Sequence, residues 1–340
     1  MPSDAGSIAA ARRSVLRSVA GSWDFVLLVI LAAVLFGAIG WIDNFAETIT
    51  VTFLLLDVIP IALMATALTL VIVTGEIDLS VASILGLTSA VLGQLWLSGF
   101  PLEIAIALCV LLGAVLGAVN GLFVAGLGLP SLAVTIGTLA LYRGLAYVVL
   151  GDRAVADFPF EWTTRAISTI GDTGIPVAVL PVIGLALLFG VTLHATPIGR
   201  ALYAIGNNAD TARFSGISVS WTKFWTFVAS GVMSSLAGIF WTFRYASARA
   251  DNGLGLELAV VAAVLLGGVS IFGGRGNLIG VLAAVVLLAT LQRTLQLASA
   301  TDEVLNLVIG SLLILSVVVP NVVQMLRQRI RPTVLEGPTP

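Results

Sequence analysis

The chain has 340 residues, of which 59% are hydrophobic and 10% are charged, and its mean hydropathy of +1.10 indicates that most of it folds in lipid. A formal net charge of -2, with no basic run outside the two termini, excludes a role led by electrostatic attraction to nucleic acid. The single Cys109 and single His194 leave no residues for an intrachain disulfide or a Cys/His metal cluster, so we expect no metal or cofactor in this chain.

The N-terminal segment carries Arg12, Arg13 and Arg17 ahead of an apolar stretch at 25–42. This order resembles a secretory signal. The apolar part is too long for one, however, and many apolar segments follow it. We therefore expect residues 1–24 to be a cytoplasmic tail that leads into an uncleaved first spanning helix.

Apolar windows of about 20 residues, the length that crosses a bilayer, recur along the chain. The predicted spans cover residues 25–42, 51–73, 79–98, 103–126, 131–150, 176–193, 221–243, 256–272, 278–297 and 304–321. Backbone groups in hydrocarbon must bond within their own segment, so these runs are expected to be helices. The sequence predicts an all-α, polytopic bundle of about ten helices over 25–323, followed by a cytoplasmic tail at 324–340.

Small residues are spaced for close helix contact on one of these spans. Gly113, Gly117 and Gly121 recur at every fourth position, the spacing found where two helix backbones touch in a membrane. This face is expected to pack against another helix.

The distribution of Lys and Arg predicts the orientation. An even number of spans with an internal N-terminus places ten of these residues inside: Arg12, Arg13, Arg17, Arg200, Arg213, Lys223, Arg275, Arg327, Arg329 and Arg331. Four fall outside, namely Arg153, Arg165, Arg244 and Arg249, and two lie within spans, namely Arg143 and Arg293. Both termini are therefore expected in the cytoplasm.

Two long loops stand out. The external loop, about 151–174, contains the alternating run 158–162, which suggests a short interfacial segment. The internal loop, 194–220, contains a polar stretch in which Asn207 or Asn208 is able to cap a short helix through Ala212. Gly216 is then expected to end the helix in a left-handed turn. The loop is either a solvated connection or an element that receives force from a separate motor.

Ionisable residues at membrane depth are costly and therefore point to function. Asp57, Arg143 and Arg293 meet this description. Asp57, with Pro60 three residues later, suggests a locally broken stretch that faces a solute path. An internal ion pair or a structural carboxylate explains Asp57 equally well.

The run Thr74–Val81 reads TGEIDLSV. Gly75 permits a tight turn, and Asp78 or Ser80 is able to accept the free N–H groups that open the next helix. Direct contact with a solute is the alternative.

Four segments resemble the permeases of ATP-binding-cassette importers for ribose, xylose, arabinose, galactose and rhamnose. The first is 74–81, in which Glu76 replaces the usual Gly, and the second runs from Asn120-Gly121 through Pro130 to Arg143-Gly144. The third is the internal loop, and the fourth is 248–280, whose details resemble the rhamnose branch and the related autoinducer branch. The resemblance covers nearly the whole chain.

The resemblance implies a monosaccharide permease in the bacterial inner membrane. Its partners would be an ATPase subunit that holds ATP-Mg, a second permease chain, identical or a sister, and an extracytoplasmic sugar-binding protein. The residues expected to contact the ATPase are Tyr203, Gly206, Asn207, Asp210, Thr211, Ala212, Arg213, Gly216 and Ile217. Those expected along the translocation path are Asp57, Asp78, Asn120, Thr135 and Arg143. Asp210 stands where the family has Glu, and Thr211 where it has Ala.

Other readings are weaker. The lone Lys223 lies outside any phosphate-binding loop, so the chain is not expected to hydrolyse ATP itself. A secondary transporter of a small polar solute is the main alternative, although its internal repeats are not evident by inspection. An intramembrane enzyme is disfavoured because His194 lies at a helix end and Asp57 and Asp78 are far apart in the chain.

Overall fold

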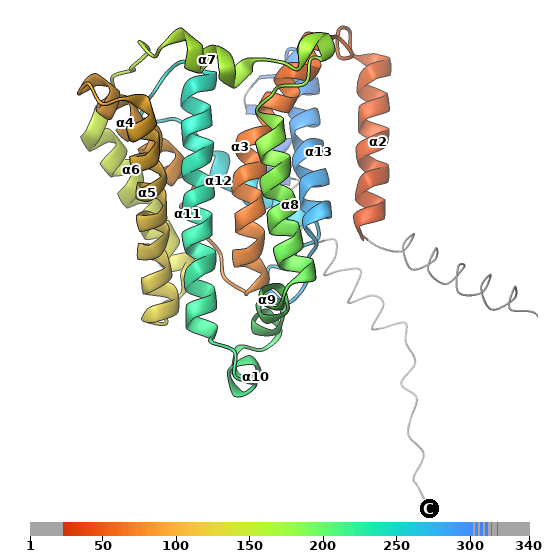
Figure 1. The fold of residues 1–340 in the computed structure, drawn as a ribbon. Coiled ribbons are helices and arrows are strands. Elements are labelled where there is room, and N and C mark those ends of the chain that lie inside the picture. Colours follow the sequence, from red (N-terminus) through yellow and green to blue (C-terminus); the bar gives the residue numbers. More distant parts are fainter. Residues whose placement is uncertain are drawn as a thin grey trace, which may run out of the picture.

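A computed structural model describes residues 23–301 and, beyond them, residues 303, 304, 307, 308, 310, 311, 314 and 318. Within this part of the chain the regular structure is helical, with two isolated β-bridges (Figure 1). The prediction of an all-α membrane bundle is confirmed. Both predicted tails, apart from Trp23 and Asp24, and most of the tenth predicted span lie outside the described residues, as do the six arginines at the two ends of the sequence.

Six described helical stretches are long and apolar enough to cross a bilayer. They are α2 (Trp23–Trp41), α3 (Thr48–Val73), α5 (Leu102–Gly121) with its π-helical continuation η1 (Leu122–Gly126), α6 (Ser131–Leu150), α11 (Val219–Arg244) and α13 (Leu278–Leu297). A seventh span is possible if α8 (Val179–Ala195) and α9 (Pro197–Asn207), which meet at an angle of 66°, count together. The expected ten spans are therefore not confirmed.

Two of the expected spans are shorter than predicted. The first is α4 (Val81–Leu97), and the second is α12 (Leu256–Leu266), which ends where Gly267 begins a turn. At about 1.5 Å per residue, the eleven residues of α12 extend about 16 Å, which is roughly half of a bilayer core. The prediction of a span at 256–272 is wrong because hydropathy does not distinguish a helix buried in protein from one that crosses lipid.

The same order of elements occurs twice. α3 and α11 each have 26 residues, and each is followed by a non-helical segment and then a shorter helix, α4 or α12. The two long helices run in opposite directions (Figure 1). The break predicted beside Pro60 is wrong, because α3 continues through it, and the chain leaves the helix at residues 74–80 instead. Non-helical backbone at membrane depth is tolerated where protein surrounds it.

α11 is the central helix and packs against α3, α4 and α5. Its contact with α5 uses the small residues that the sequence analysis singled out. A side chain on Gly113 would overlap Ser235, and one on Gly117 would overlap the backbone of Phe227. Gly231 of α11 is equally close to the backbone of Gly113. The predicted close approach of two helices is confirmed.

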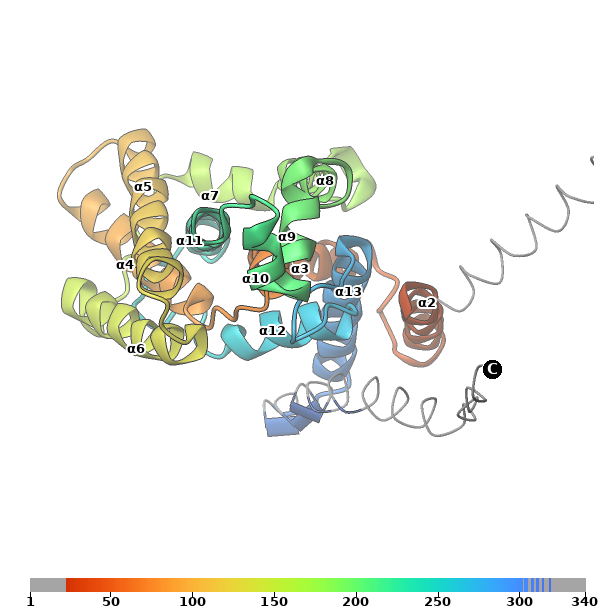
Figure 2. The ribbon, with the colours of Figure 1, turned by 90° about the horizontal axis from the view of Figure 1, so that it is seen from below.

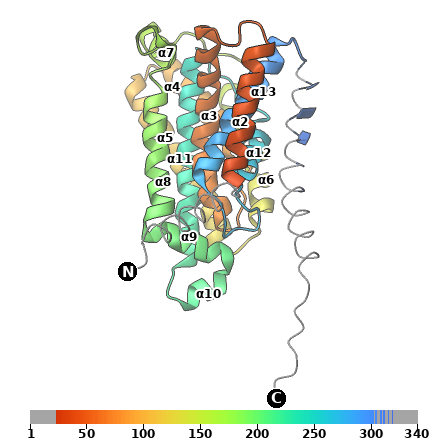
Figure 3. The ribbon, with the colours of Figure 1, turned by 90° about the vertical axis from the view of Figure 1, so that its right-hand side faces the viewer.

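The bundle has two distinct ends. α7 (Phe160–Ile167) lies across one end, where Trp162 stacks on Phe243 with ring centroids 5.5 Å apart. The short segment expected in the first long loop is thus a helix, and its location at the membrane interface stays a prediction. α9 and α10 (Ala209–Phe214) lie at the opposite end (Figure 1). α2 stands beside the bundle (Figure 3), and its first residue donates from Trp23 Nε1 to the carbonyl of Leu266 at 2.7 Å.

Candidate functional site

Two short helices, α9 and α10, form the projecting end of the molecule. Pro197 opens α9 at a position where its fixed φ suits a helix. Thr196 caps the same helix, since its side chain accepts from Gly199 N–H at 3.4 Å. A side chain on Gly199 would overlap the backbone of Leu193, so only glycine fits the bend. The bend turns α9 across the end of the bundle, as seen from below in Figure 2.

α10 has well-defined ends. Of the two candidate asparagines it is Asn208 that caps the helix, because Asn208 Oδ1 accepts from Thr211 N–H at 2.8 Å. At the other end Gly216 has φ +84°, the left-handed conformation expected from the sequence. Ile217 N–H then donates to the carbonyl of Ala212 at 3.1 Å. The helix boundaries are thus specified locally.

α10 has an inner and an outer face. Ala212 packs with Ile205 and Val219 in a small buried cluster. The outer residues are exposed: Asp210, Thr211, Arg213 and Phe214. Phe214 is 93% exposed, and Asp210 lies 3.7 Å from Arg213 across one turn. The outer face of α10 thus presents one exposed aromatic side chain beside an acidic and a basic residue.

α9 connects this surface to the transmembrane bundle. Tyr203 Oη donates to the carbonyl of Gly276 at 2.8 Å. A side chain on Gly206 would overlap the carbonyl of Val73 and the N–H of Gly274, which are themselves hydrogen-bonded at 2.9 Å. α9 therefore touches the end of α3 and the turn between α12 and α13.

A buried polar network surrounds Asp78 in the segment between α3 and α4. Asp78 Oδ1 accepts from the N–H of Ser80 at 2.9 Å and from its hydroxyl at 2.6 Å, and Oδ2 accepts from Ser230 Oγ at 2.8 Å. Asn120 Nδ2 donates to Ser80 Oγ at 2.8 Å, and Thr135 donates to the carbonyl preceding Asp78 at 3.2 Å. Three predicted path residues thus meet here. Because protein donors occupy both oxygens of the fully buried Asp78, the geometry favours a structural role.

Arg143 of α6 joins the second non-helical segment, 245–255, to α4. Its Nη1 donates to the carbonyls of Ala250 and Asn252 at 2.7 and 2.8 Å. Its Nη2 donates to the carbonyl of Ala82 at 3.1 Å. Arg143 thus bonds three backbone carbonyls at once, and it does not belong to the network around Asp78.

A charge pair lies beside these contacts. Arg249 Nε and Nη2 donate to the two carboxylate oxygens of Asp251 at 2.7 and 2.8 Å. These hydrogen bonds hold the pKa of Asp251 below its usual range. The pair lies in the same segment, 245–255, whose carbonyls Arg143 bonds.

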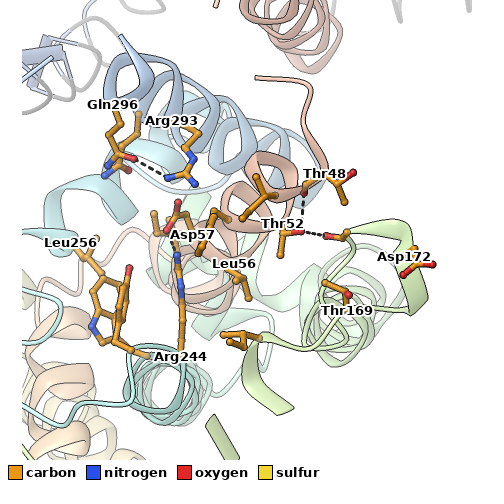
Figure 4. A pocket seen from close by; sticks show the side chains of 18 of the residues that line it. Thr48, Thr52, Leu56, Asp57, Thr169, Asp172, Arg244, Leu256, Arg293 and Gln296 are labelled. Atoms are coloured by element: carbon orange, nitrogen blue, oxygen red, sulfur yellow. Dashed lines mark hydrogen bonds and ion pairs between the residues drawn. The ribbon is translucent and has the colours of Figure 1, made fainter. Parts of the chain in front are cut away.

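Asp57 lies in a different place, in a cavity of about 830 Å³ near the α7 end of the bundle (Figure 4). Arg244, at the end of α11, is ion-paired with Asp57. Arg293 of α13 also lines the cavity and lies over the ring of Phe53, 5.0 Å from its centroid. Of the two alternatives for Asp57, the structure contains the internal ion pair, and a solute path at this residue stays a prediction.

The chain matches the family described as the permease component of branched-chain amino acid transport systems over residues 50–317. The chain belongs to this permease family. It is 34% identical to the autoinducer 2 import system permease protein LsrD of Yersinia enterocolitica over 87% of this chain and 91% of that protein. It is also 34% identical to the protein of that name from Escherichia coli strain HS over 91% and 94%. No solved structure matches the chain.

Family membership confirms the resemblance derived from the motifs. The permease is a transport subunit of an importer and not an enzyme. A multi-pass permease lies in the membrane, as its apolar helices require.

Sequence reasoning missed the partners of the membrane-depth charges in the permease. Arg244 was assigned to an external loop, yet it closes α11 and pairs with a residue 187 positions earlier. Hydropathy carries no signal for such a pairing. The sequence indicates the pair only through the position of Arg244, a charged residue directly at the end of the predicted span 221–243.

Proposed function

We propose that this permease takes up a small sugar-like solute through an ATP-binding-cassette importer, and that the solute is autoinducer 2 or a related compound. The named relatives are autoinducer 2 import permeases that match this chain over most of both lengths. Ribose and rhamnose are the alternative solutes that the motifs suggest. A separate ATPase subunit that binds ATP-Mg, an extracytoplasmic binding protein and a second permease chain complete the importer.

The single observation that carries this proposal is the outer face of α10. A six-residue helix, capped by Asn208 and ended at Gly216, holds Phe214 in the open, while its inner face is fixed to α9. The predicted ATPase-contact residues divide accordingly. Asp210, Thr211 and Arg213 face outward, whereas Tyr203, Gly206 and Ala212 fix the element to the bundle. We assign the outer group to ATPase contact and the inner group to transmission.

The proposed orientation places α9 and α10 in the cytoplasm. α2 begins at this end, since Asp24 accepts from Asn277 Nδ2 at 2.7 Å close to the anchor of Tyr203. Four basic residues of the described chain lie at the same end: Arg200, Arg213, Lys223 and Arg275. The positive-inside rule favours the cytoplasm for that end.

Transport follows from the connections of α9. ATP-driven approach of two ATPase subunits would displace α10 and α9 together. The displacement reaches the end of α3 and the α12–α13 turn through Tyr203 and Gly206. The non-helical segment 74–80 begins directly after Val73, so a displacement of α9 would act on this segment and on the packing around it.

Two exposed phenylalanines provide a matched test. Phe214 on α10 is 93% exposed and Phe160 on α7, at the opposite end, is 81% exposed. The variant Phe214→Asp should lose the ATP-hydrolysing subunit during purification of the tagged permease complex, and Phe160→Asp should retain it. Retention of the ATPase by Phe214→Asp, in a complex that still imports, would refute the docking assignment.

The solute and the energy source are tested in cells that lack another autoinducer 2 importer. Uptake of autoinducer 2 should depend on the permease and stop on ATP depletion, while an ionophore at constant ATP leaves it unchanged. Uptake that stops with the ionophore instead would indicate a secondary transporter. If the permease takes up ribose or rhamnose but not autoinducer 2, the proposed solute is wrong and the proposed ATP-driven mechanism still stands.

A further inference from the structure

The cavity near the α7 end is lined by α3, the loop 167–174, the end of α11 and α13 (Figure 4). Its volume of about 830 Å³ is large enough for a small solute and the water around it. The residues that line it all belong to one chain. It lies apart from the network around Asp78.

Two guanidinium groups in its wall have unused donors. Among the described residues, three buried side-chain nitrogen or oxygen atoms lack a hydrogen-bond partner, and two of them are Arg244 Nη1 and Arg293 Nε. The side chain of Arg244 is only 6% exposed. A buried donor without a partner costs free energy, so a site with two of them is suited to a ligand that supplies acceptor oxygens.

The charged side chains of the cavity wall indicate which kind of ligand the cavity would bind. Asp57 accepts from Arg244 through Oδ1, which leaves Oδ2 as an acceptor for a ligand hydroxyl. No carboxylate among the described residues forms an ion pair with Arg293. Donors and an acceptor thus stand side by side, the pattern that binds vicinal hydroxyl groups.

The wall also contains aromatic and amide side chains, beside threonines, aliphatic residues and a second carboxylate, Asp172. Trp241 and Tyr245 lie with ring centroids 4.9 Å apart, and the guanidinium of Arg244 lies 4.8 Å from the centre of the Tyr245 ring. Gln292 and Gln296 of α13 add further donors and acceptors. Flat aromatic surface suits the C–H face of a sugar ring, and amides suit its hydroxyls.

We propose that this cavity is a binding site for a small polyhydroxylated solute, with Arg244, Arg293 and Asp57 as its polar contacts. The proposal rests on the proposed function, because that function supplies both the solute class and the extracytoplasmic orientation of the cavity. The site would receive the solute before it enters the path between two permease chains. Each solute would be held by several weak contacts, as transport requires.

The test uses the full-length permease in phosphatidylcholine nanodiscs, with ribose, rhamnose and autoinducer 2 as separate probes. Saturation-transfer NMR detects weak binding of each. The variant Arg293→Gln removes a guanidinium that has no ion-pair partner among the described residues and that contacts the ring of Phe53 and the side chain of Gln296. The control Arg165→Gln removes an exposed arginine of α7 whose side chain is 72% exposed. Loss of charge-assisted hydrogen bonds should weaken binding about tenfold in Arg293→Gln, and Arg165→Gln should bind as the wild type does.

Two results would overturn the proposal. One is equal binding of a probe by Arg293→Gln and wild type. The other is the absence of any probe signal, together with retention of phosphatidylglycerol that depends on Arg293, which would identify a lipid headgroup site. Uptake by the complete importer is measured in parallel. ATP-dependent uptake by a wild-type chain whose cavity binds nothing would reject this site and leave the proposed function standing.

Discussion

Lys223, at the start of α11, forms an ion pair with Glu76, in the non-helical segment between α3 and α4. The two side chains are 16% and 17% exposed. The pair links the helix that follows α10 to the segment that holds Asp78. Glu76 stands where the sugar-permease signature that this segment resembles has Gly.

Breaking this pair should destabilise the permease. Lys223→Met leaves a largely buried carboxylate without its partner, and we expect a loss of about 2 kcal/mol, between the values typical of exposed and fully buried pairs. Thermal unfolding in detergent measures it. A double-mutant cycle compares Glu76→Lys, Lys223→Glu and the double variant that exchanges the two charges. The double variant should recover more than half of the stability that the two single variants lose together. Additive losses would show that the pair is not coupled.

Removal of Asp78 should have a larger effect. Asp78→Ala leaves two hydroxyls and an N–H without their acceptor in a fully buried network, which should cost about 3 kcal/mol or more. Ser230→Ala removes only one donor and should cost about 1 kcal/mol. Unfolding of the two variants under the same conditions compares them. Equal stability of Asp78→Ala and wild type would contradict the structural role and revive direct solute contact.

The sequence predicted local features of the permease well. The cap at Asn208, the left-handed turn at Gly216 and the glycine face of α5 each depend on residues within a few positions of one another. A short stretch of sequence is therefore enough to predict each of these three features. The internal loop was for this reason predicted in its main features.

Long-range features were not predicted. Parts of the non-helical segments at 74–80 and 245–255 are buried, and Ser230 and Arg143 bond polar groups in these parts. Neither partner is close in sequence, and both segments border apolar runs that read as ordinary spans. The cavity beside Asp57 depends in the same way on residues from α3, α11 and α13. Hydropathy reports how apolar a segment is and not what surrounds it.

Gly206 provides a test of transmission. Gly206→Val adds a side chain where the carbonyl of Val73 and the N–H of Gly274 already lie, so α9 must move away from the bundle. Uptake should fall at least about tenfold, since misplacement by about an ångström is enough to disrupt a coupled packing. The amount of permease in the membrane is measured alongside uptake. The control Gly184→Val lies in α8 with no atom within 4 Å of an added Cβ and should transport normally.

Arg143 is the last test, because its geometry separates charge from shape. Its two terminal nitrogens donate to the carbonyls of Ala250, Asn252 and Ala82, which a planar guanidinium can reach together. Lysine keeps the charge but ends in a single nitrogen, so Arg143→Lys should lose at least one of the three contacts and about 1–2 kcal/mol of stability. Arg165→Lys, on the exposed face of α7, is the matched control and should unfold as the wild type does. If Arg143→Lys is as stable as the wild type while Arg143→Gln is not, positive charge rather than the set of three hydrogen bonds holds the segment 245–255 against α4.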